Sequence, residues 1–229
     1  MGIFDRFKKA DVAPGVDGAT GYAGDVKNKT PFAARSVEMF VTDLSSKASV
    51  PGGGGAAALA GALAAALGSM AANLSMKPSE QDSEMQVMKT YLYRIQTELV
   101  ALIDKDAEAF APLAGAWRLP ERNDSEKENK ERVVQACLKQ AADVPMETLR
   151  KSCEAAVLLK ALSEKGGVRA QSDVVCGAIL CRAALEAAWV NVRANTALMA
   201  DEAYARRLEE DAQALLRKYL PTMDAVAGA

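Results

Sequence analysis

Four consecutive glycines, placed directly before an alanine-rich stretch, are the residues of this chain best suited to hold a ligand. Pro51 precedes them, and small apolar residues follow. A glycine-rich loop that opens a helix leaves the first backbone N–H groups uncovered, at the positive end of the helix dipole. Such N–H groups bind anions. The run lacks the other residues of the dinucleotide-binding and P-loop motifs, and a flexible linker is the alternative interpretation. The candidate binding residues are Gly52, Gly53, Gly54 and Gly55.

A pair of carboxylates offers acid–base chemistry further along the chain. Asp104 and Asp106 lie two positions apart within the segment 102–110, which has helical periodicity. At 100° per residue the two side chains point to different faces, so one can be solvated while the other turns inward. The alternative interpretation, which needs no function, is that these carboxylates form a polar edge of the helix. The inward carboxylate is the candidate for proton transfer.

The complete absence of histidine restricts the chemistry that this chain can perform. Histidine is the usual general base at neutral pH and the commonest metal ligand. Proton transfer must therefore fall to carboxylates, lysines, cysteines or water, and we expect no metal site. The four cysteines form no C-x-x-C pair and follow no secretory signal, which predicts reduced thiols and a cytoplasmic protein.

Two further polar clusters are candidates for binding. Asn191 and Asn195 lie four residues apart on one predicted helix face, where amides form helices poorly and are often kept for hydrogen bonding. Ser172 and Asp173 have the pattern of a helix cap followed by a first-turn carboxylate, which needs no function to explain it.

Composition indicates a globular protein with a sizeable core. Half of the 229 residues are apolar, the formal net charge is −2, and aromatic residues make up 5%. The chain therefore has no basic field for nucleic acid and few rings on which bases could stack. We expect neither nucleic acid nor a membrane as a partner.

The periodicity of apolar residues predicts an all-α bundle of about seven helices, with long antiparallel helices. We interpret residues 1–33 as a mobile N-terminal extension and residues 34–229 as one helical domain. No segment alternates like a strand. Proline is expected to begin one helix at Pro145 and to follow the last one at Pro221. The expected helices are 36–44, 55–76, 80–117, 125–142, 145–166, 172–200 and 201–219.

The second of these helices is apolar almost throughout. Its length approaches that of a membrane span, but alanine and glycine bury little area, so we interpret it as part of a core. Small residues recur on one face and allow another helix to approach closely, within the chain or across a subunit interface. They are Gly61, Ala65, Gly68 and Ala72.

These segments together resemble the formimidoyltetrahydrofolate cyclodeaminase/methenyltetrahydrofolate cyclohydrolase family. The resemblance covers about residues 36–220, and the motifs occur in the order of that family. They are Pro51–Gly54 with the alanine-rich helix, Leu102–Phe110, Arg118–Pro120, Val144–Pro145, Ser172–Asp173 and Asn191–Asn195. Members are all-helical folate enzymes that assemble at least as dimers. The chain has no room for the transferase domain of animal members, so it resembles the free-standing bacterial kind.

The resemblance implies a role for each candidate. Asp106 corresponds to the catalytic aspartate of the family segment, with Asp104 in reserve. The glycine loop would form part of the folate pocket, together with Asp173, Asn191 and Asn195. The implied reaction is hydrolysis of 5,10-methenyltetrahydrofolate to the 10-formyl product, with no cofactor. Cyclodeamination of 5-formiminotetrahydrofolate, or folate or partner binding without catalysis, are the alternatives.

Two positions depart from the family pattern. Gly55 stands where many members have serine, and Ser75–Pro78 replaces a threonine followed by tyrosine and basic residues. If these positions contact the pterin or the glutamate tail, affinity or activity changes.

Overall fold

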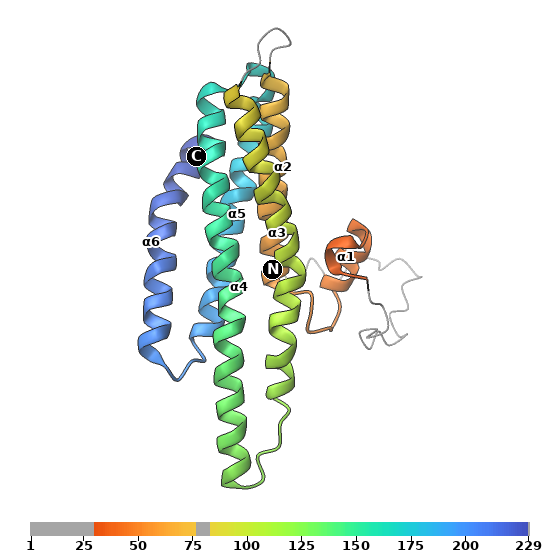
Figure 1. Ribbon diagram of the computed structural model, residues 1–229, viewed down its shortest axis with the longest axis vertical. Coiled ribbons are helices and arrows are strands. Elements are labelled where there is room, and N and C mark those ends of the chain that lie inside the picture. The colour runs from red at the N-terminus through yellow and green to blue at the C-terminus, as the bar shows by residue number, and fades with distance from the viewer. Residues whose placement is uncertain (1–29, 77–82, 229) are drawn as a thin grey trace, which may run out of the picture.

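The computed structural model of the protein describes residues 30–76 and 83–228, and within these ranges it contains helices and no strand. Most of the extension predicted at residues 1–33 therefore lies outside the described residues. The described residues form six α-helices and two short 3-10 turns (Figure 1). The helices are α1 (Val37–Leu44), α2 (Gly53–Ser75), α3 (Ser83–Ala116), α4 (Asp124–Lys165), α5 (Gln171–Thr196) and α6 (Glu202–Ala227), and the turns are η3 (Phe32–Ala34) and η4 (Val168–Ala170).

Helix α2 lies at the centre of the bundle, between α3, α4 and α5. Its alanines favour helix, and its glycines allow larger neighbours to approach. A Cβ at Gly68 would lie 3.1 Å from Leu92 of α3 and 3.2 Å from Leu159 of α4. The small-residue face thus packs within the chain, which settles the choice left open between internal packing and a subunit interface.

Helix α2 is also the one helix of the described residues that is long and apolar enough to cross a bilayer. Length and composition alone carry little weight, because the core helix of a soluble bundle has the same character. In this structure 56% of its most apolar window is buried against other helices.

The largest difference from the expected helices concerns α4. Residues 125–142 and 145–166 were predicted as two helices, but α4 runs unbroken from Asp124 to Lys165 with Pro145 inside it. The prediction was wrong because proline at a first turn and proline inside a helix look alike in sequence, and buried packing on both sides of Pro145 sustains the helix. The bundle consequently has six α-helices rather than about seven.

Two helix ends also differ from expectation. Helix α6 continues through Pro221 to Ala227, so that proline does not end the helix. Helix α5 begins at Gln171 after Ala170, so Ser172 is not its cap, although Asp173 does lie in the first turn. Beyond this proline, Met223 is fully buried and Asp224 accepts a hydrogen bond of 2.6 Å from Arg182 of α5, so tertiary contacts hold the last turns of α6.

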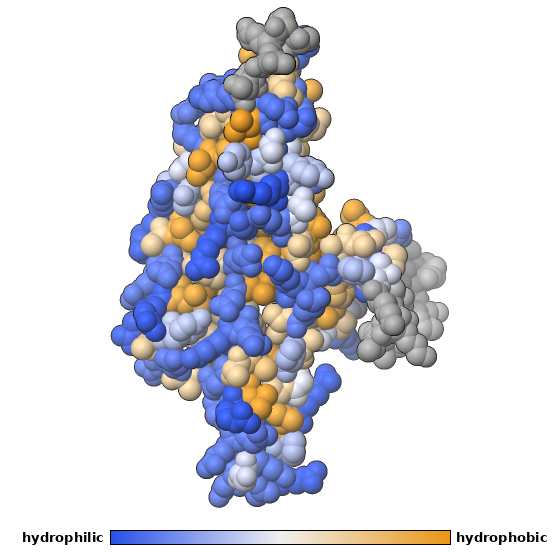
Figure 2. All heavy atoms as spheres, viewed as in Figure 1, coloured by the Kyte–Doolittle hydropathy of each residue, from blue (hydrophilic) through white to orange (hydrophobic). Residues whose placement is uncertain are grey.

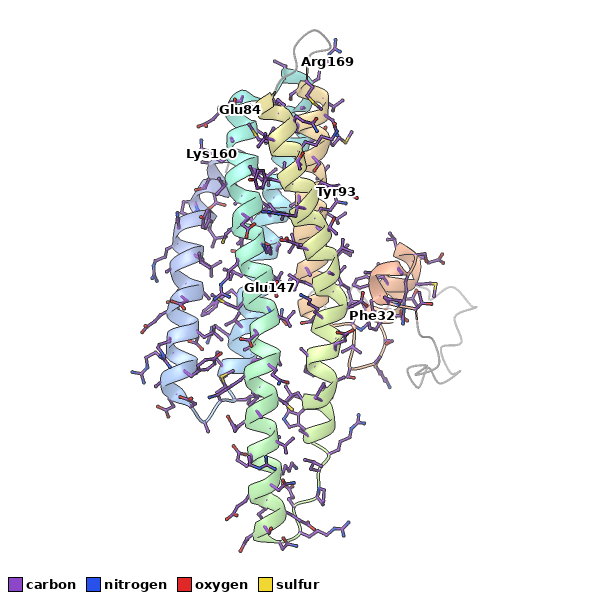
Figure 3. The ribbon with its side chains drawn as sticks, viewed as in Figure 1. Phe32, Glu84, Tyr93, Glu147, Lys160 and Arg169 are labelled. Carbon is purple, nitrogen blue, oxygen red and sulfur yellow. The ribbon has the colours of Figure 1, made fainter. Side chains whose placement is uncertain are left out.

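Two surface features stand out beside the bundle. Helices α3 and α4 extend together as a hairpin, whose tip is covered mainly by hydrophilic residues (Figures 1 and 2). Helix α1 projects from the bundle beside α3 (Figure 1), and Figure 3 places Phe32 between α1 and α3. We call residues 30–52, which contain η3 and α1 and lead into α2, the N-terminal arm.

Candidate functional site

The site residues gather at the N-terminus of α2. A cavity of about 270 Å³ lies there, between the end of the N-terminal arm and the helices α2, α3, α4 and α5. The sequence candidates that line it are Gly52, Gly53, Gly54, Asp106, Asn191 and Asn195. Segments separated by more than a hundred residues are thus brought to one place. The remaining lining residues are Ser49, Val50, Phe110, Leu113, Trp117, Ala141, Ala194 and Leu198.

Asp106 lies directly against the first turn of α2. Its Oδ2 accepts a hydrogen bond of 3.0 Å from the backbone N–H of Gly55. A Cβ at Gly54 would lie 2.0 Å from Oδ1 of the same carboxyl group, so only glycine leaves room for it. The glycine run is therefore a close-packed surface for the carboxyl group, and the linker interpretation fails for Gly54.

Burial raises the pKa of Asp106 above its ordinary value, and the hydrogen bond from Gly55 opposes this rise. Burial disfavours the charged form, whereas an N–H donor favours it. A carboxyl group whose pKa is raised toward neutral pH exchanges protons more effectively at that pH.

Two other N–H groups of the glycine run remain open to a ligand. Gly53 and Gly54 occupy the first turn of α2, where backbone N–H groups have no partner within the helix. Neither N–H has an acceptor among the residues that the structure describes. Gly55 differs, because its N–H is already bonded to Asp106. The expected anion-binding surface is therefore smaller than Gly53–Gly55.

The two asparagines of α5 form the opposite wall. Asn191 Nδ2 donates to the carbonyl oxygen of Ala187 at 2.8 Å, and its amide lies 3.2 Å from where a Cβ of Gly53 would be. Asn195 Nδ2 donates to the carbonyl oxygens of Asn191 at 2.9 Å and Ala141 at 3.4 Å. Both Oδ1 atoms are without a donor among the described residues. They are acceptors for a ligand.

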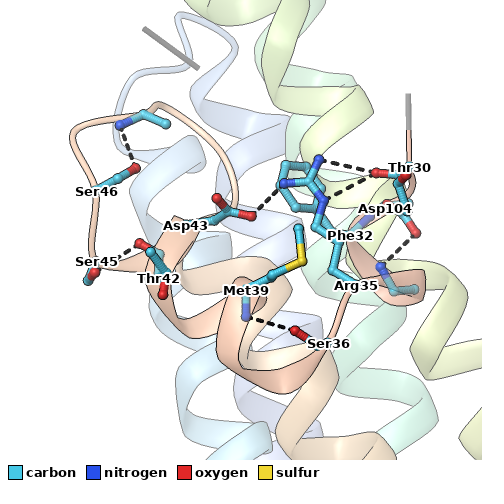
Figure 4. A network of polar contacts seen from close by, with 12 residues as sticks. Thr30, Phe32, Arg35, Ser36, Met39, Thr42, Asp43, Ser45, Ser46 and Asp104 are labelled. Atoms are coloured by element: carbon cyan, nitrogen blue, oxygen red, sulfur yellow. Dashed lines mark hydrogen bonds and ion pairs between the residues drawn. The ribbon is translucent and has the colours of Figure 1, made fainter. Parts of the chain in front are cut away.

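Asp104 has a different place and different partners. Its carboxylate accepts hydrogen bonds from the backbone N–H groups of Phe32 at 2.6 Å and Ala33 at 3.3 Å, at the start of η3 (Figure 4). Arg35 stacks on the Phe32 ring and pairs with Asp43. Asp104 thus fastens the N-terminal arm to α3, and the boundary predicted after residue 33 falls inside η3.

Two sequence candidates lie far from this cavity. Asp173 is in the first turn of α5, about 27 Å along the helix axis from Asn191. Ser75 ends α2, and its hydroxyl donates to Ala71 and accepts from the N–H of Gly167. The structure does not bring Asp173 into this cavity, and its binding role stays a prediction. Ser75 and Met76 do not line this cavity, and Lys77 and Pro78 lie outside the described residues.

The departure at Gly55 is likewise compatible with the site. A Cβ there would meet its nearest neighbours at 3.7 Å, an ordinary contact. A serine at this position would fit without displacing Asp106.

Sequence reasoning missed the aromatic wall of the cavity. Phe110 and Trp117 contact each other edge to face, with ring centroids 5.8 Å apart. Together with Leu113 they continue the helical face of Asp106, at spacings of four, three and four residues. That periodicity was visible in the sequence. It could not be told from an ordinary core face, because apolar spacing does not reveal which side of the helix borders a cavity.

The cysteines do not provide an alternative nucleophile at this site. None of them lines the cavity, and Cys137, Cys153 and Cys181 are buried. Burial raises the pKa of Cys153 to about 12 and raises that of Cys181 as well. Such thiols stay protonated and poorly nucleophilic at neutral pH.

The fold and the site together define a class of protein: an all-helical protein with a buried carboxyl group set against the open N-terminus of a glycine-initiated helix. The sequence model of the formiminotransferase-cyclodeaminase family matches residues 36–214. The chain belongs to this family.

Individual relatives agree with that assignment. A methenyltetrahydrofolate cyclohydrolase of Methylorubrum extorquens is 34% identical over 184 residues, which cover 79% of this chain and 88% of that protein. A formimidoyltransferase-cyclodeaminase of Gallus gallus is 34% identical over 72% of this chain, which spans 31% of its length. The crystal structure of a formiminotetrahydrofolate cyclodeaminase from Thermotoga maritima superimposes with a TM-score of 0.72, covering 85% of this chain and 96% of that one, at 27% identity.

Proposed function

We propose that the protein is a methenyltetrahydrofolate cyclohydrolase, which converts 5,10-methenyltetrahydrofolate and water to 10-formyltetrahydrofolate. The observation that carries this proposal is the position of Asp106, buried and in contact with the first turn of α2. The 34% identical relative bears the name of this activity.

The reaction needs one group that both accepts and returns a proton. Water adds to the cationic carbon between N5 and N10, and the Asp106 carboxylate takes a proton from it. The carbon–N5 bond then breaks, N5 receives that proton from the Asp106 carboxyl group, and the hydroxyl oxygen becomes the formyl oxygen. The second proton of the water is released to solvent. A carboxyl group of raised pKa can serve in both directions.

The open N–H groups of α2 have a role in the same step. The oxygen derived from water gains electron density as it becomes a carbonyl, and backbone donors that are already oriented stabilise such charge. Gly53 and Gly54 present their N–H groups beside Asp106. We assign the reacting oxygen to these donors.

The volumes of the cavity and of the groove beside it support a placement for the two ends of the folate ligand. About 270 Å³ is smaller than the usual range for a drug-sized ligand and is suited to the reduced pteridine rings. Trp117 and Leu198 also line a wider open groove of about 870 Å³ beside the first turns of α4. The benzoyl-glutamate end would leave the cavity along this groove.

Cyclodeamination is the second candidate, because the structural match in Thermotoga maritima bears that name. In that reaction N10 attacks the formimino carbon, and ammonia leaves. The same carboxylate would take the proton of N10 and pass it to the departing nitrogen.

Two assays test these proposals. Purified protein should deplete the methenyl chromophore faster than the spontaneous rate, and Asp106→Asn should slow this by about a hundredfold or more. Spectral perturbation without depletion would indicate binding alone. Ammonia release from 5-formiminotetrahydrofolate, with no gain over the spontaneous rate on the methenyl compound, would favour cyclodeamination.

We also propose a homodimer or higher homo-oligomer in the cytoplasm. Support for assembly comes from apolar side chains left exposed on the adjoining helices α2 and α5 and on α1. The small-residue face gives no such support, because it is buried within the chain. The exposed residues are Leu63, Met70, Leu74, Ile179, Val190, Val37, Met39 and Val41.

A further inference from the structure

Pro145 is unusual among the prolines inside the helices of this structure. Pro112 and Pro221 are exposed and lie in the final turns of α3 and α6. Pro145 is buried in the middle of the 42-residue helix α4. A proline in a helix interior is far less favourable than alanine, so its presence there calls for a physical reason.

The consequence of Pro145 falls on the carbonyl group of Ala141. In a regular helix the N–H of residue 145 would donate to this oxygen, but proline has no N–H. The proline ring also crowds the same carbonyl. Ala141 therefore has an oxygen without its helical partner.

That oxygen contacts a side chain that lines the cavity. Asn195 Nδ2 donates to it at 3.4 Å, which is long for a hydrogen bond. Both Ala141 and Asn195 line the cavity, so the atom that joins them lies at its wall. The Asn195 amide already makes a shorter bond of 2.9 Å to Asn191. A carbonyl oxygen has two lone pairs, so Ala141 can accept a further hydrogen bond beside the long one from Asn195.

We propose that Pro145 exposes the main-chain carbonyl of Ala141 as a hydrogen-bond acceptor for the ligand, and that it receives an N–H or amino group of the reduced pteridine ring. This inference rests on the proposed folate function. The ring carries several such donors, whereas the opposite wall offers the N–H donors of Gly53 and Gly54. The cavity lining thus includes both main-chain donors and a main-chain acceptor.

Three variants test the proposal by restoring an N–H at position 145 or at a control site. Pro145→Ala and Pro145→Val both supply the missing donor to Ala141, but only valine keeps a bulk similar to that of the proline ring. Pro221→Ala makes the same chemical change in α6, away from the cavity. Affinity for 5-formyltetrahydrofolate, a stable reduced folate, is measured by calorimetry, with circular dichroism and thermal melting to verify the fold.

Occupation of one neutral acceptor should weaken binding by about three- to tenfold in both Pro145 variants and leave Pro221→Ala unchanged. Weaker binding in Pro145→Ala but wild-type affinity in folded Pro145→Val would assign the effect to lost packing and overturn the proposal. Wild-type affinity in both folded variants would overturn it while leaving the folate function intact. Failure of the wild-type protein to bind or convert any reduced folate would reject the function and this inference together.

Discussion

Replacing Gly54 with alanine should disable the site without unfolding α2. A Cβ at this position would lie 2.0 Å from Oδ1 of Asp106, whereas ordinary contacts begin at 3.4 Å. The carboxyl group must therefore move by roughly 1.4 Å, which disrupts its bond of 3.0 Å to the N–H of Gly55. A misplacement of about 1 Å costs on the order of a hundredfold in rate, so we expect turnover to fall by about that factor.

The helix itself has no reason to fail in this variant. Alanine is a better helix former than glycine by about 1 kcal/mol, and Gly54 has no positive φ angle that would disfavour a side chain. Two glycines offer matched controls. A Cβ at Gly55 meets atoms no closer than 3.7 Å, and one at Gly115 of α3 meets nothing within 4 Å. Gly55→Ala and Gly115→Ala should therefore retain turnover close to the wild type.

The assay is steady-state depletion of the methenyl substrate, with far-UV circular dichroism measured on the same samples. Wild-type turnover in a folded Gly54→Ala protein would refute the close packing of Asp106 against α2. An equal loss in Gly54→Ala and Gly55→Ala would also count against the argument, because it would show general sensitivity of the loop. Gly53→Ala should fall between them, since its Cβ meets the Asn191 amide at 3.2 Å.

Three further predictions concern charge, the N-terminal arm and assembly. Burial raises the pKa of Asp106 in the folded protein above its value in the unfolded chain. This group therefore stabilises the fold most at pH values below its unfolded pKa, and the stabilisation is lost as pH rises through its folded pKa. Asp106→Asn should therefore have a higher melting temperature than the wild type at pH 7, and this difference should disappear near pH 3. A difference that instead grows on acidification would contradict the raised pKa of Asp106. Asp104→Ala removes the acceptor for the backbone N–H groups of Phe32 and Ala33, so limited proteolysis at Arg35 should become faster. Its turnover should fall less than that of Asp106→Asn. An unaltered rate of proteolysis would show that Asp104 does not fasten the N-terminal arm. Light scattering should give at least twice the chain mass of 24.2 kDa, and an active monomer at micromolar concentration would reject the assembly.

The sequence predicted the helical class and several helix boundaries because these depend on local signals. Ser36 does cap α1, accepting a hydrogen bond from the N–H of Met39, and α2 ends at Ser75, where it was expected to end near residue 76. The helix boundaries predicted at Pro145 and Pro221 were wrong, since tertiary packing decides whether a helix continues through a proline. Local pattern cannot weigh that packing.

The choice between Asp104 and Asp106 shows the same limit. Periodicity predicted that the two carboxylates would face different directions, and the structure confirms it. It could not predict that both would be bound to backbone N–H groups, one at a surface turn and the other at the start of a core helix. The partners lie 72 and 51 residues away in the sequence, so only the folded chain distinguishes the two.

The number of N–H groups that Asp106 engages determines what it can do. A carboxylate that accepts two or three backbone N–H bonds at a helix N-terminus has a strongly lowered pKa and is a poor proton donor. Asp106 accepts one, from Gly55, and burial outweighs it. In the proposed reaction the N–H groups of Gly53 and Gly54 consequently stay available for the reacting oxygen, while the raised pKa of the carboxyl group favours exchange of its proton. The absence of a side chain at Gly54 makes this contact possible, because a Cβ there would lie 2.0 Å from Oδ1 of Asp106.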